Sequence, residues 1–227
     1  MSIAEKLTTI AENEQKVYDA GAKSEYDKFW DAYQKNGSKT DYAHAFRHMT
    51  KDICKPKYNI KTTSLEGTFY YLTWLTDFDE WLESCGITLD TSKATTLYLG
   101  FQGCSNLTKI GTIDMSSSTQ NFRLFFNCAA LREVGRCIVS EATTYQQTFY
   151  NTASLVTINF EGVIANNGLD FSLSGKLSHD SLMSIINCLK NYTGSGTTHS
   201  VTLGTTNLAK LTDAEKAIAT QKGWTLA

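Results

Sequence analysis

The chain has 227 residues, a formal net charge of −2 and 41% hydrophobic residues, which suits one large globular domain or two small ones. A charge so close to zero excludes a general attraction to nucleic acid or to anionic membranes. No apolar run reaches the roughly 18 residues of a membrane-spanning helix, and the first residues lack the pattern of a secretory signal peptide. We therefore expect a protein that is made in the cytoplasm and has neither nucleic-acid nor membrane partners.

Residues 1–22 are predicted to form a helix with a heptad-like seam, capped by Ser2 together with Glu5. Its apolar side chains recur at spacings of three, four and seven, and they are Ile3, Leu7, Ile10 and Val17. A helix this short is not stable alone, so it must pack on the next helix, on copies of itself or in a larger assembly. Glu14 lies in the same seam and favours the last two, because a partly solvated oligomer interface accommodates a carboxylate better than a dry core.

Residues 23–60 are predicted to form a helical N-terminal cap. A second helix begins after Ser24 and ends near Gly37, and a short third helix is expected over residues 40–48. The second helix carries an aromatic stripe at helical spacing, formed by Tyr26, Phe29, Trp30 and Tyr33. Such a stripe is either a platform for carbohydrate or a face packed on the core, and helical spacing favours the core.

The middle of the chain, residues 61–172, contains an internal repeat. The pattern F-x-x-[CT]-x-x-L-x-x-[IV] begins at Phe101, Phe125 and Phe149, at a spacing of 24 residues. Residues 89–92 align with residues 113–116 at the same spacing. A degenerate unit is therefore expected before Phe101, with Phe78 near its start.

A unit of this size cannot bury its own apolar face, so it must stack on its neighbours. We expect one short strand per unit, stacked in parallel, near residues 109–110, 133–134 and 157–158. The recurring apolar positions should be buried, namely Phe101, Phe125, Phe149, Leu107, Leu131 and Leu155. The small residues that share one phase, which are Cys104, Cys128 and Thr152, fit inside a turn where they can bond a neighbouring backbone group.

Residues 173–227 have a different pattern and are predicted to form a C-terminal α/β cap. Ser178 caps a helix whose apolar side carries Leu182, Ile185, Ile186 and Leu189. Residues 200–203 alternate like a strand, residues 213–222 form a second helix, and residues 224–226 form a final strand. Terminal units of a repeat protein must differ from the others because they close its apolar core. Trp224 is therefore interpreted as packing rather than as a ligand contact.

Over residues 87–160 the pattern resembles the BspA-type leucine-rich repeats, whose units read F-x-x-C-x-x-L-x-x-I. Residues 2–33 and 177–227 also resemble members encoded by bacteriophages of gut bacteria. The resemblance implies an α/β leucine-rich repeat solenoid with N-terminal helices and a C-terminal α/β cap. It further implies surface recognition. Secreted adhesins of the family carry export signals, which are not evident here, and this favours a phage structural protein located in the virion.

Motifs for catalysis or cofactor binding are not evident in the sequence. His44 and His48 have the spacing of a zinc peptidase motif, but Ala45 stands where the general base is needed, so surface histidines are the better interpretation. The six cysteines form no C-x-x-C pair, which argues against structural zinc and for reduced, buried thiols. Asp180, beside His179, suits a helix start. We expect no enzyme activity, no cofactor and no metal, although a glycosidase carboxylate pair remains an alternative.

The repeat phase predicts which side chains of each strand point outward. The strongest candidates for ligand binding are Lys109, Arg132, Glu133 and Asn159. Both charge signs and small residues on one face suit a polar ligand such as a bacterial surface glycan or a protein loop. The expected function is recognition of a bacterial surface component by a phage appendage, with other virion proteins as partners and a homotrimer as the favoured assembly. The alternatives are a carbohydrate-active enzyme, an intracellular protein-interaction module, or a solvated face that has no partner.

Overall fold

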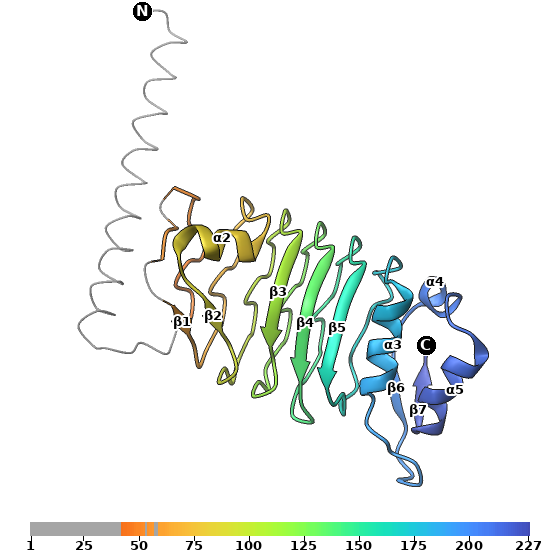
Figure 1. Ribbon diagram of the computed structural model, residues 1–227. Coiled ribbons are helices and arrows are strands. Elements are labelled where there is room, and N and C mark those ends of the chain that lie inside the picture. Colours follow the sequence, from red (N-terminus) through yellow and green to blue (C-terminus); the bar gives the residue numbers. More distant parts are fainter. Residues whose placement is uncertain (1–41, 53, 57–58) are drawn as a thin grey trace, which may run out of the picture.

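A computed structural model describes residues 42–52, 54–56 and 59–227 as a mixed α/β structure with short parallel sheets. The predicted seam of residues 1–22 and the aromatic stripe of residues 26–33 lie outside the described residues. In chain order the elements are β1 (Ile60–Lys61), α2 (Phe78–Cys85), β2 (Leu89–Asp90), β3 (Lys109–Asp114), β4 (Glu133–Val139), β5 (Thr157–Gly162), α3 (His179–Cys188), β6 (His199–Val201), α4 (Thr205–Leu208), α5 (Asp213–Gln221) and β7 (Trp224–Leu226). They follow one another along an elongated stack (Figure 1).

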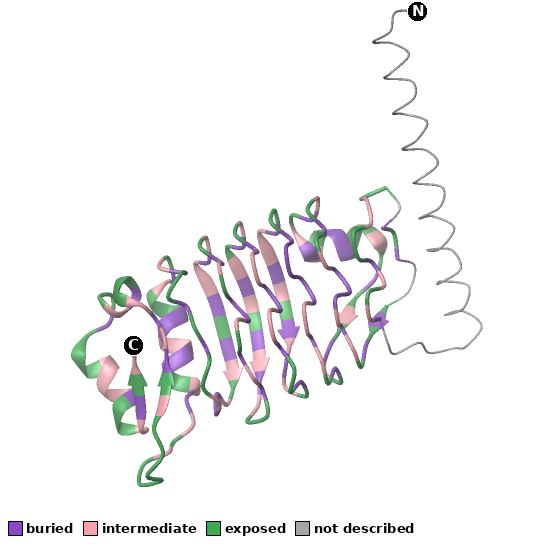
Figure 2. Cartoon of the chain, turned by 180° about the vertical axis from the view of Figure 1, so that it is seen from behind, coloured by how far each residue is buried: buried purple, intermediate pink, exposed green. Residues whose placement is uncertain are grey.

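The three central strands pair in parallel with the expected register. Lys109 of β3 lies beside Glu133 of β4, which lies beside Thr157 of β5, so each step advances by one repeat. The predicted parallel strands are therefore confirmed, and they extend to six or seven residues each. Along these strands buried positions recur at every second or third residue, with exposed or half-buried positions between them (Figure 2), so one face of the sheet lies in the core.

A ladder of phenylalanine rings forms the centre of the core behind the strands. Neighbouring rings stack with centroids 4.9 to 5.6 Å apart, and the ladder contains Phe46, Phe69, Phe101, Phe125, Phe149 and Phe171. All six rings are buried. The leucines of the repeat, Leu107, Leu131 and Leu155, are also fully buried, so the predicted core positions are confirmed.

The ladder corrects the expectation for the unit before Phe101, which begins with Phe69 and not with Phe78. Phe69 stacks directly on Phe101, and hydrogen bonds between these two units join residues 32 positions apart. The unit is thus eight residues longer than its 24-residue neighbours, and α2 itself has eight residues. Phe78 is the first residue of this inserted helix, where it packs edge-on against Phe69 and Phe101.

The short helix expected over residues 40–48 is wrong for the part that the structure describes. Residues 43–48 form turns whose backbone N–H groups bond the next unit. The N–H groups of His44 and Phe46, for example, donate to the carbonyls of Glu66 and Thr68 at 2.8 and 3.0 Å. The segment is therefore the turn of a further stacked unit, because its donors are used between units and not four residues back along a helix.

The five units from Phe46 to Phe149 each contain two residues in the left-handed backbone region, two positions before and two positions after the ladder phenylalanine. They are His44 and His48, Gly67 and Tyr71, Leu99 and Gly103, Arg123 and Asn127, and Gln147 and Asn151, with φ between 53° and 74°. This backbone conformation costs about 1–2 kcal/mol for a residue with a Cβ atom. The stacked turns nevertheless use it repeatedly, which shows that contacts between units determine the turn geometry.

All six cysteines are free, and four of them are buried while Cys85 and Cys188 are half-buried. The Sγ atoms of Cys104 and Cys128 donate to the carbonyls of Phe69 and Phe101 in the preceding units at 3.0 and 3.1 Å. The expected turn role of these thiols is confirmed. Burial raises the pKa of Cys104 to about 12, and it also raises the pKa of Cys128 well above its usual value.

The C-terminal part contains the expected helix, strand, helix and strand, together with the short helix α4. β6 pairs in parallel with β7, and the two strands bring His199 beside Trp224. Trp224 is buried and its Nε1 donates to the carbonyl of Lys190 at 2.8 Å, so its interpretation as a packing residue is confirmed. Helix α3 follows β5 directly in the stack, with α5 and β7 beyond it (Figure 1).

Candidate functional site

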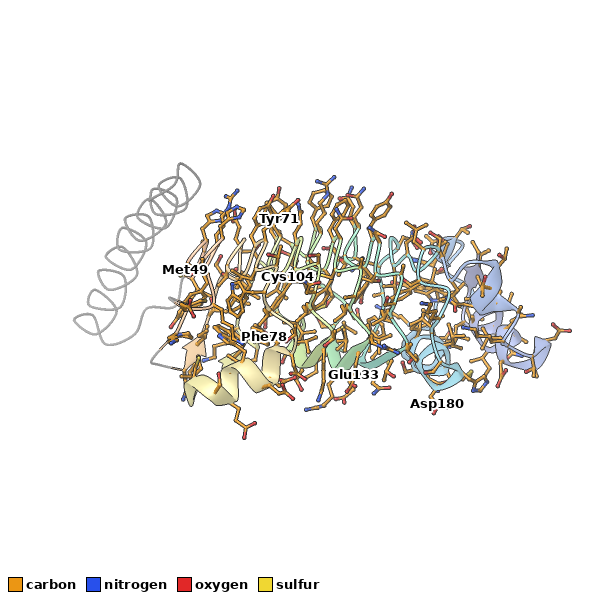
Figure 3. The ribbon with its side chains drawn as sticks, turned by 90° about the horizontal axis from the view of Figure 1, so that it is seen from above. Met49, Tyr71, Phe78, Cys104, Glu133 and Asp180 are labelled. Carbon is orange, nitrogen blue, oxygen red and sulfur yellow. The ribbon has the colours of Figure 1, made fainter. Side chains whose placement is uncertain are left out.

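The predicted binding residues lie on the outward face of β3, β4 and β5. Ile110, Val134 and Ile158 point inward and are fully buried, so the residues before them point away from the core. Lys109 and Glu133 are half-buried neighbours, while Arg132 is exposed just before β4. Figure 3 shows Glu133 and Tyr71 on opposite long sides of the stack, with Cys104 between them. The structure therefore brings Lys109, Arg132 and Glu133 together on one face.

Two glycines shape the middle of this face. The pairing of β3 with β4 passes directly from Ile110 and Val134 to the next pair, and it skips Gly111 and Gly135. A Cβ atom on Gly135 would lie 2.5 Å from the carbonyl oxygen of Gly111, so a larger residue does not fit. Asn159, the fourth predicted residue, is exposed and donates from Nδ2 to the carbonyl of Gly135 at 2.9 Å. Part of its hydrogen-bonding capacity is therefore already used within the sheet.

An exposed ion pair on the same face was missed by the sequence prediction. Arg136 donates from both Nε and a terminal guanidinium nitrogen to the two carboxylate oxygens of Glu161, each at 2.7 Å. These hydrogen bonds lower the pKa of the Glu161 carboxyl. The bulge after Gly135 moves the outward position by one residue, so a strict alternation from Glu133 does not find Arg136. The glycine shared by both units was the only signal of this shift.

Side chains from two helices close the edges of the three-stranded sheet. On the β3 edge, the carboxylate of Asp79 in α2 accepts a hydrogen bond from the backbone N–H of Gly111. On the β5 edge, Ser181 and Ser184 of α3 accept the backbone N–H groups of Ile158 and Phe160 at 3.0 and 3.2 Å. These contacts satisfy backbone donors that an open sheet edge leaves unpaired. The outward face is thus an open platform bounded by α2 and α3.

A pocket of about 500 Å³ lies where α2 borders this platform. Asp79 and Glu83 line it together with the exposed Thr112 of β3. Burial raises the pKa of Asp79, and the hydrogen bond from Gly111 acts in the opposite direction. Lys109 lies outside this pocket, with its Nζ 4.0 Å from Asp77, the N-cap residue of α2.

The opposite long side of the stack carries a second group of side chains that the sequence prediction did not select. We call it the turn edge, and its partly exposed aromatic residues are Tyr70, Tyr71, Tyr98, Phe122, Phe126 and Tyr150. The guanidinium carbon of Arg123 lies 4.6 Å from the ring centroids of both Phe122 and Phe126. The repeated aromatic residue after the ladder phenylalanine, as in Phe126 and Tyr150, was the available signal.

The histidines proposed to lie at the surface do so, since His44 and His48 are both exposed. His48 stacks on Tyr71 with centroids 5.7 Å apart. His179 Nε2 in α3 lies 2.8 Å from Glu215 in α5. Ser178 is the N-cap residue of α3, and Asp180 lies in the first turn of this helix, as expected. Within residues 42–52, 54–56 and 59–227, no cluster of three or more His, Cys, Asp or Glu side chains is arranged to hold a metal ion.

None of the helices in the described part of the chain combines the length and the apolar character needed to cross a bilayer. Comparisons with protein-family models, with curated proteins and with solved structures found no match for this chain.

Proposed function

We propose that the chain is a leucine-rich repeat solenoid of the BspA type, which recognises a bacterial surface component without catalysing a reaction. The observation that carries this proposal is the open platform of β3, β4 and β5 between α2 and α3. Its strands are held rigidly by the phenylalanine ladder behind them, and their outward side chains are polar and of both charge signs. A rigid face of this kind binds a polar ligand with little loss of conformational entropy.

The platform supports recognition of a hydroxylated or charged ligand through several moderate contacts. Both partners of the ion pair between Arg136 and Glu161 are exposed, with 55% and 45% of the two side chains accessible to solvent. Exposed ion pairs contribute little to stability, so these groups can exchange partners with a ligand at low cost. Lys109, Arg132, Glu133 and Asn159 extend the same surface, and we propose that a bacterial surface glycan or protein binds there.

We propose further that the protein is part of a phage particle, made in the host cytoplasm and assembled with other virion proteins. The support is the resemblance of residues 2–33 and 177–227 to phage members of the family. In this proposal Ile3, Leu7, Ile10 and Val17, which lie outside the described residues, form a trimer seam. Sedimentation with purified virions tests this part. If the protein stays in the soluble fraction of the lysate and does not sediment with the virions, the intracellular interaction module is supported instead.

The recognition site is tested with a fourfold variant, Lys109→Ala, Arg132→Ala, Glu133→Ala and Asn159→Ala, in an assay of adsorption to host cells. A matched control replaces four exposed polar residues outside the platform and its bordering helices and carries the same change of net charge: Lys93, Lys176, Asn191 and Asp213. Both proteins are first compared by thermal unfolding. We expect adsorption to fall only in the platform variant. Equal adsorption of both variants would place the recognition site elsewhere.

One observation favours a second candidate, a carbohydrate-active enzyme. Asp79 has a raised pKa, as a general acid requires, and shares the pocket beside α2 with Glu83. The carboxylate of Asp79 also closes the β3 edge, which explains its burial structurally. Assaying hydrolysis of host cell-wall polysaccharide by the unmodified protein and by Glu83→Gln separates the two candidates. Hydrolysis that Glu83→Gln abolishes would replace the binding proposal with the enzyme.

A further inference from the structure

The aromatic stacking of the turn edge ends at Tyr150. Phe126 stacks on Tyr150 with ring centroids 5.0 Å apart and planes 12° apart, as Tyr98 stacks on Phe122 one step earlier. The ladder phenylalanines continue one unit further, from Phe149 to Phe171. Ser172, however, stands where the next unit would place another ring. One face of the Tyr150 ring is therefore covered by Phe126, while no aromatic residue in the described part of the chain stacks on the other face.

A pocket of about 220 Å³ lies on that other side of Tyr150. It is formed where the last repeat meets the C-terminal part, so two separate regions of the chain line it. The repeat turns contribute Gln147 and Tyr150, the following loop contributes Asp170 and Leu173, and Thr202 lies next to the end of β6. Tyr150 and Leu173 are the most exposed apolar side chains in it, at 43% and 48%.

The polar groups around the pocket are oriented by contacts within the protein. Asp170 accepts the backbone N–H of Ser172 through Oδ1 at 2.8 Å, which fixes the direction of its carboxylate. Gln147 accepts a hydrogen bond from Nε of Arg123 through Oε1 at 2.7 Å. Its amide nitrogen, which carries two donors, therefore points away from Arg123. The site combines an aromatic face, a carboxylate, an oriented amide and the hydroxyl groups of Ser172 and Thr202.

We propose that this pocket binds one neutral pyranose ring of a surface glycan, with its C–H face against Tyr150. Pyranoses have one face of weakly polarised C–H groups and a rim of hydroxyl groups, which matches the negative face of an aromatic ring surrounded by donors and acceptors. The volume is below the roughly 300–1,000 Å³ of sites for drug-sized ligands, so it accommodates a single ring.

The charge of the site selects against other ligands of this size. Asp170 is the charged residue among those that line the pocket, and Arg123 is held between Phe122 and Phe126. A phosphate or a carboxylate would meet a negative charge there without a facing cation. The proposal of a pyranose site rests on the proposed function in one respect, namely that the glycan belongs to a bacterial surface.

The test uses the full chain and saturation-transfer NMR with methyl glycosides of glucose, galactose, mannose, rhamnose and N-acetylglucosamine. We expect transfer to the ring protons of at least one glycoside, and Tyr150→Ala should weaken its binding about tenfold or more. Tyr150→Phe keeps the ring and should bind within about twofold of the original protein. Tyr71→Ala removes an aromatic ring of nearly equal exposure, 41%, from the distant end of the turn edge and should leave binding unchanged.

Each result separates this pocket from the proposed recognition function. Transfer that is lost in Tyr150→Ala and kept in Tyr71→Ala supports the pocket, whether or not the protein adsorbs to host cells. The absence of transfer from every glycoside, or transfer that survives Tyr150→Ala, overturns the pocket even if adsorption depends on the β3–β5 platform. Asp170→Asn adds a second measurement, because a hydroxyl-binding carboxylate should lose several-fold in affinity when it is neutralised while the thermal transition stays the same.

Discussion

The backbone N–H of Ile158 in β5 donates a hydrogen bond to Oγ of Ser181 in α3 across 3.0 Å, in the interior of the protein. The same hydroxyl lies 3.3 Å from the carbonyl of Val156. A side chain of the following helix thus takes the place that the next strand would occupy. The three-stranded sheet ends at β5 because the outer edge of this strand is satisfied by α3, so this edge does not offer unpaired donors to another chain.

Replacing Ser181 with alanine should therefore leave the buried N–H of Ile158 without an acceptor. We expect the free energy of unfolding to fall by about 1–3 kcal/mol, the usual cost of an unsatisfied buried donor. Urea denaturation measures this change. Ser105→Ala, at an exposed turn position, is the control and should stay within about 0.5 kcal/mol of the original protein. Equal stability of the two variants would show that Ser181 does not close the sheet edge.

Leu131→Ala should destabilise the protein by about 2–5 kcal/mol, because it removes a fully buried side chain from the stacked core. The corresponding leucines of the neighbouring units, Leu107 and Leu155, should behave in the same way. Leu173→Ala is the matched control, since 48% of this side chain is exposed. Thermal and urea unfolding give the values. A loss below about 1 kcal/mol for Leu131→Ala would contradict the core assignment.

Asn151 tests the repeated left-handed turn, since its φ is 58°. Both Asn151→Ala and Asn151→Gly remove the hydrogen bond from its Nδ2 to Asn127 Oδ1. They differ in the backbone, because glycine adopts positive φ freely while alanine has a Cβ atom. The glycine variant should be more stable than the alanine variant by about 1 kcal/mol. Alanine being the more stable of the two in urea denaturation would contradict this turn geometry.

The buried thiols predict a loss of stability at alkaline pH. The pKa of Cys104 rises from 9.0 to about 12 in the folded protein, while in the unfolded chain it keeps its usual value. The stabilisation is full below about pH 9 and is lost as the pH rises toward 12, because the unfolded chain then binds fewer protons. Each such thiol contributes about 1.4 kcal/mol per pH unit across this window. Urea denaturation of Cys104→Ala between pH 8 and pH 11 should show a shallower slope. An unchanged slope would contradict the raised pKa of Cys104.

The six cysteines are also expected to be reduced. Titration of the unfolded, unreduced protein should therefore count six thiols, and a count of two or fewer would contradict this expectation.

We expect residues 2–22 to cause self-association as a trimer. Analytical sedimentation of the full chain should give an oligomer, and a chain that starts at residue 24 should give a monomer of otherwise unchanged secondary structure. A full-length variant with Ile3→Glu and Ile10→Glu provides a second measurement without truncation, because two further charges in the seam oppose its closure. A monomeric full chain would reject self-association.

Patterns of spacing predicted the parts of the fold that depend on repetition. Ile110 and Val134 could be placed inward because two-residue alternation and the repeat period agree at these positions. The three parallel strands, the buried leucines and the order of C-terminal elements followed for the same reason. Residues 43–48 were misassigned to a helix because the period of their unit is shorter and its motif degenerate, so the partners of this segment at Glu66 and Thr68 were not visible in the sequence.

The repeat, the buried face of each strand and the polar face opposite could be predicted from the sequence, because they depend on residue types at fixed separations along one chain. Which outward side chains meet became visible in the folded structure. Arg136 reaches Glu161, 25 positions away, because a bulge shifts the face by one residue. The pocket beside Tyr150 exists because Ser172 interrupts the aromatic column and β6 closes the gap from the C-terminal side. Both relationships depend on how neighbouring units are placed in space, and a one-residue shift in register would remove them.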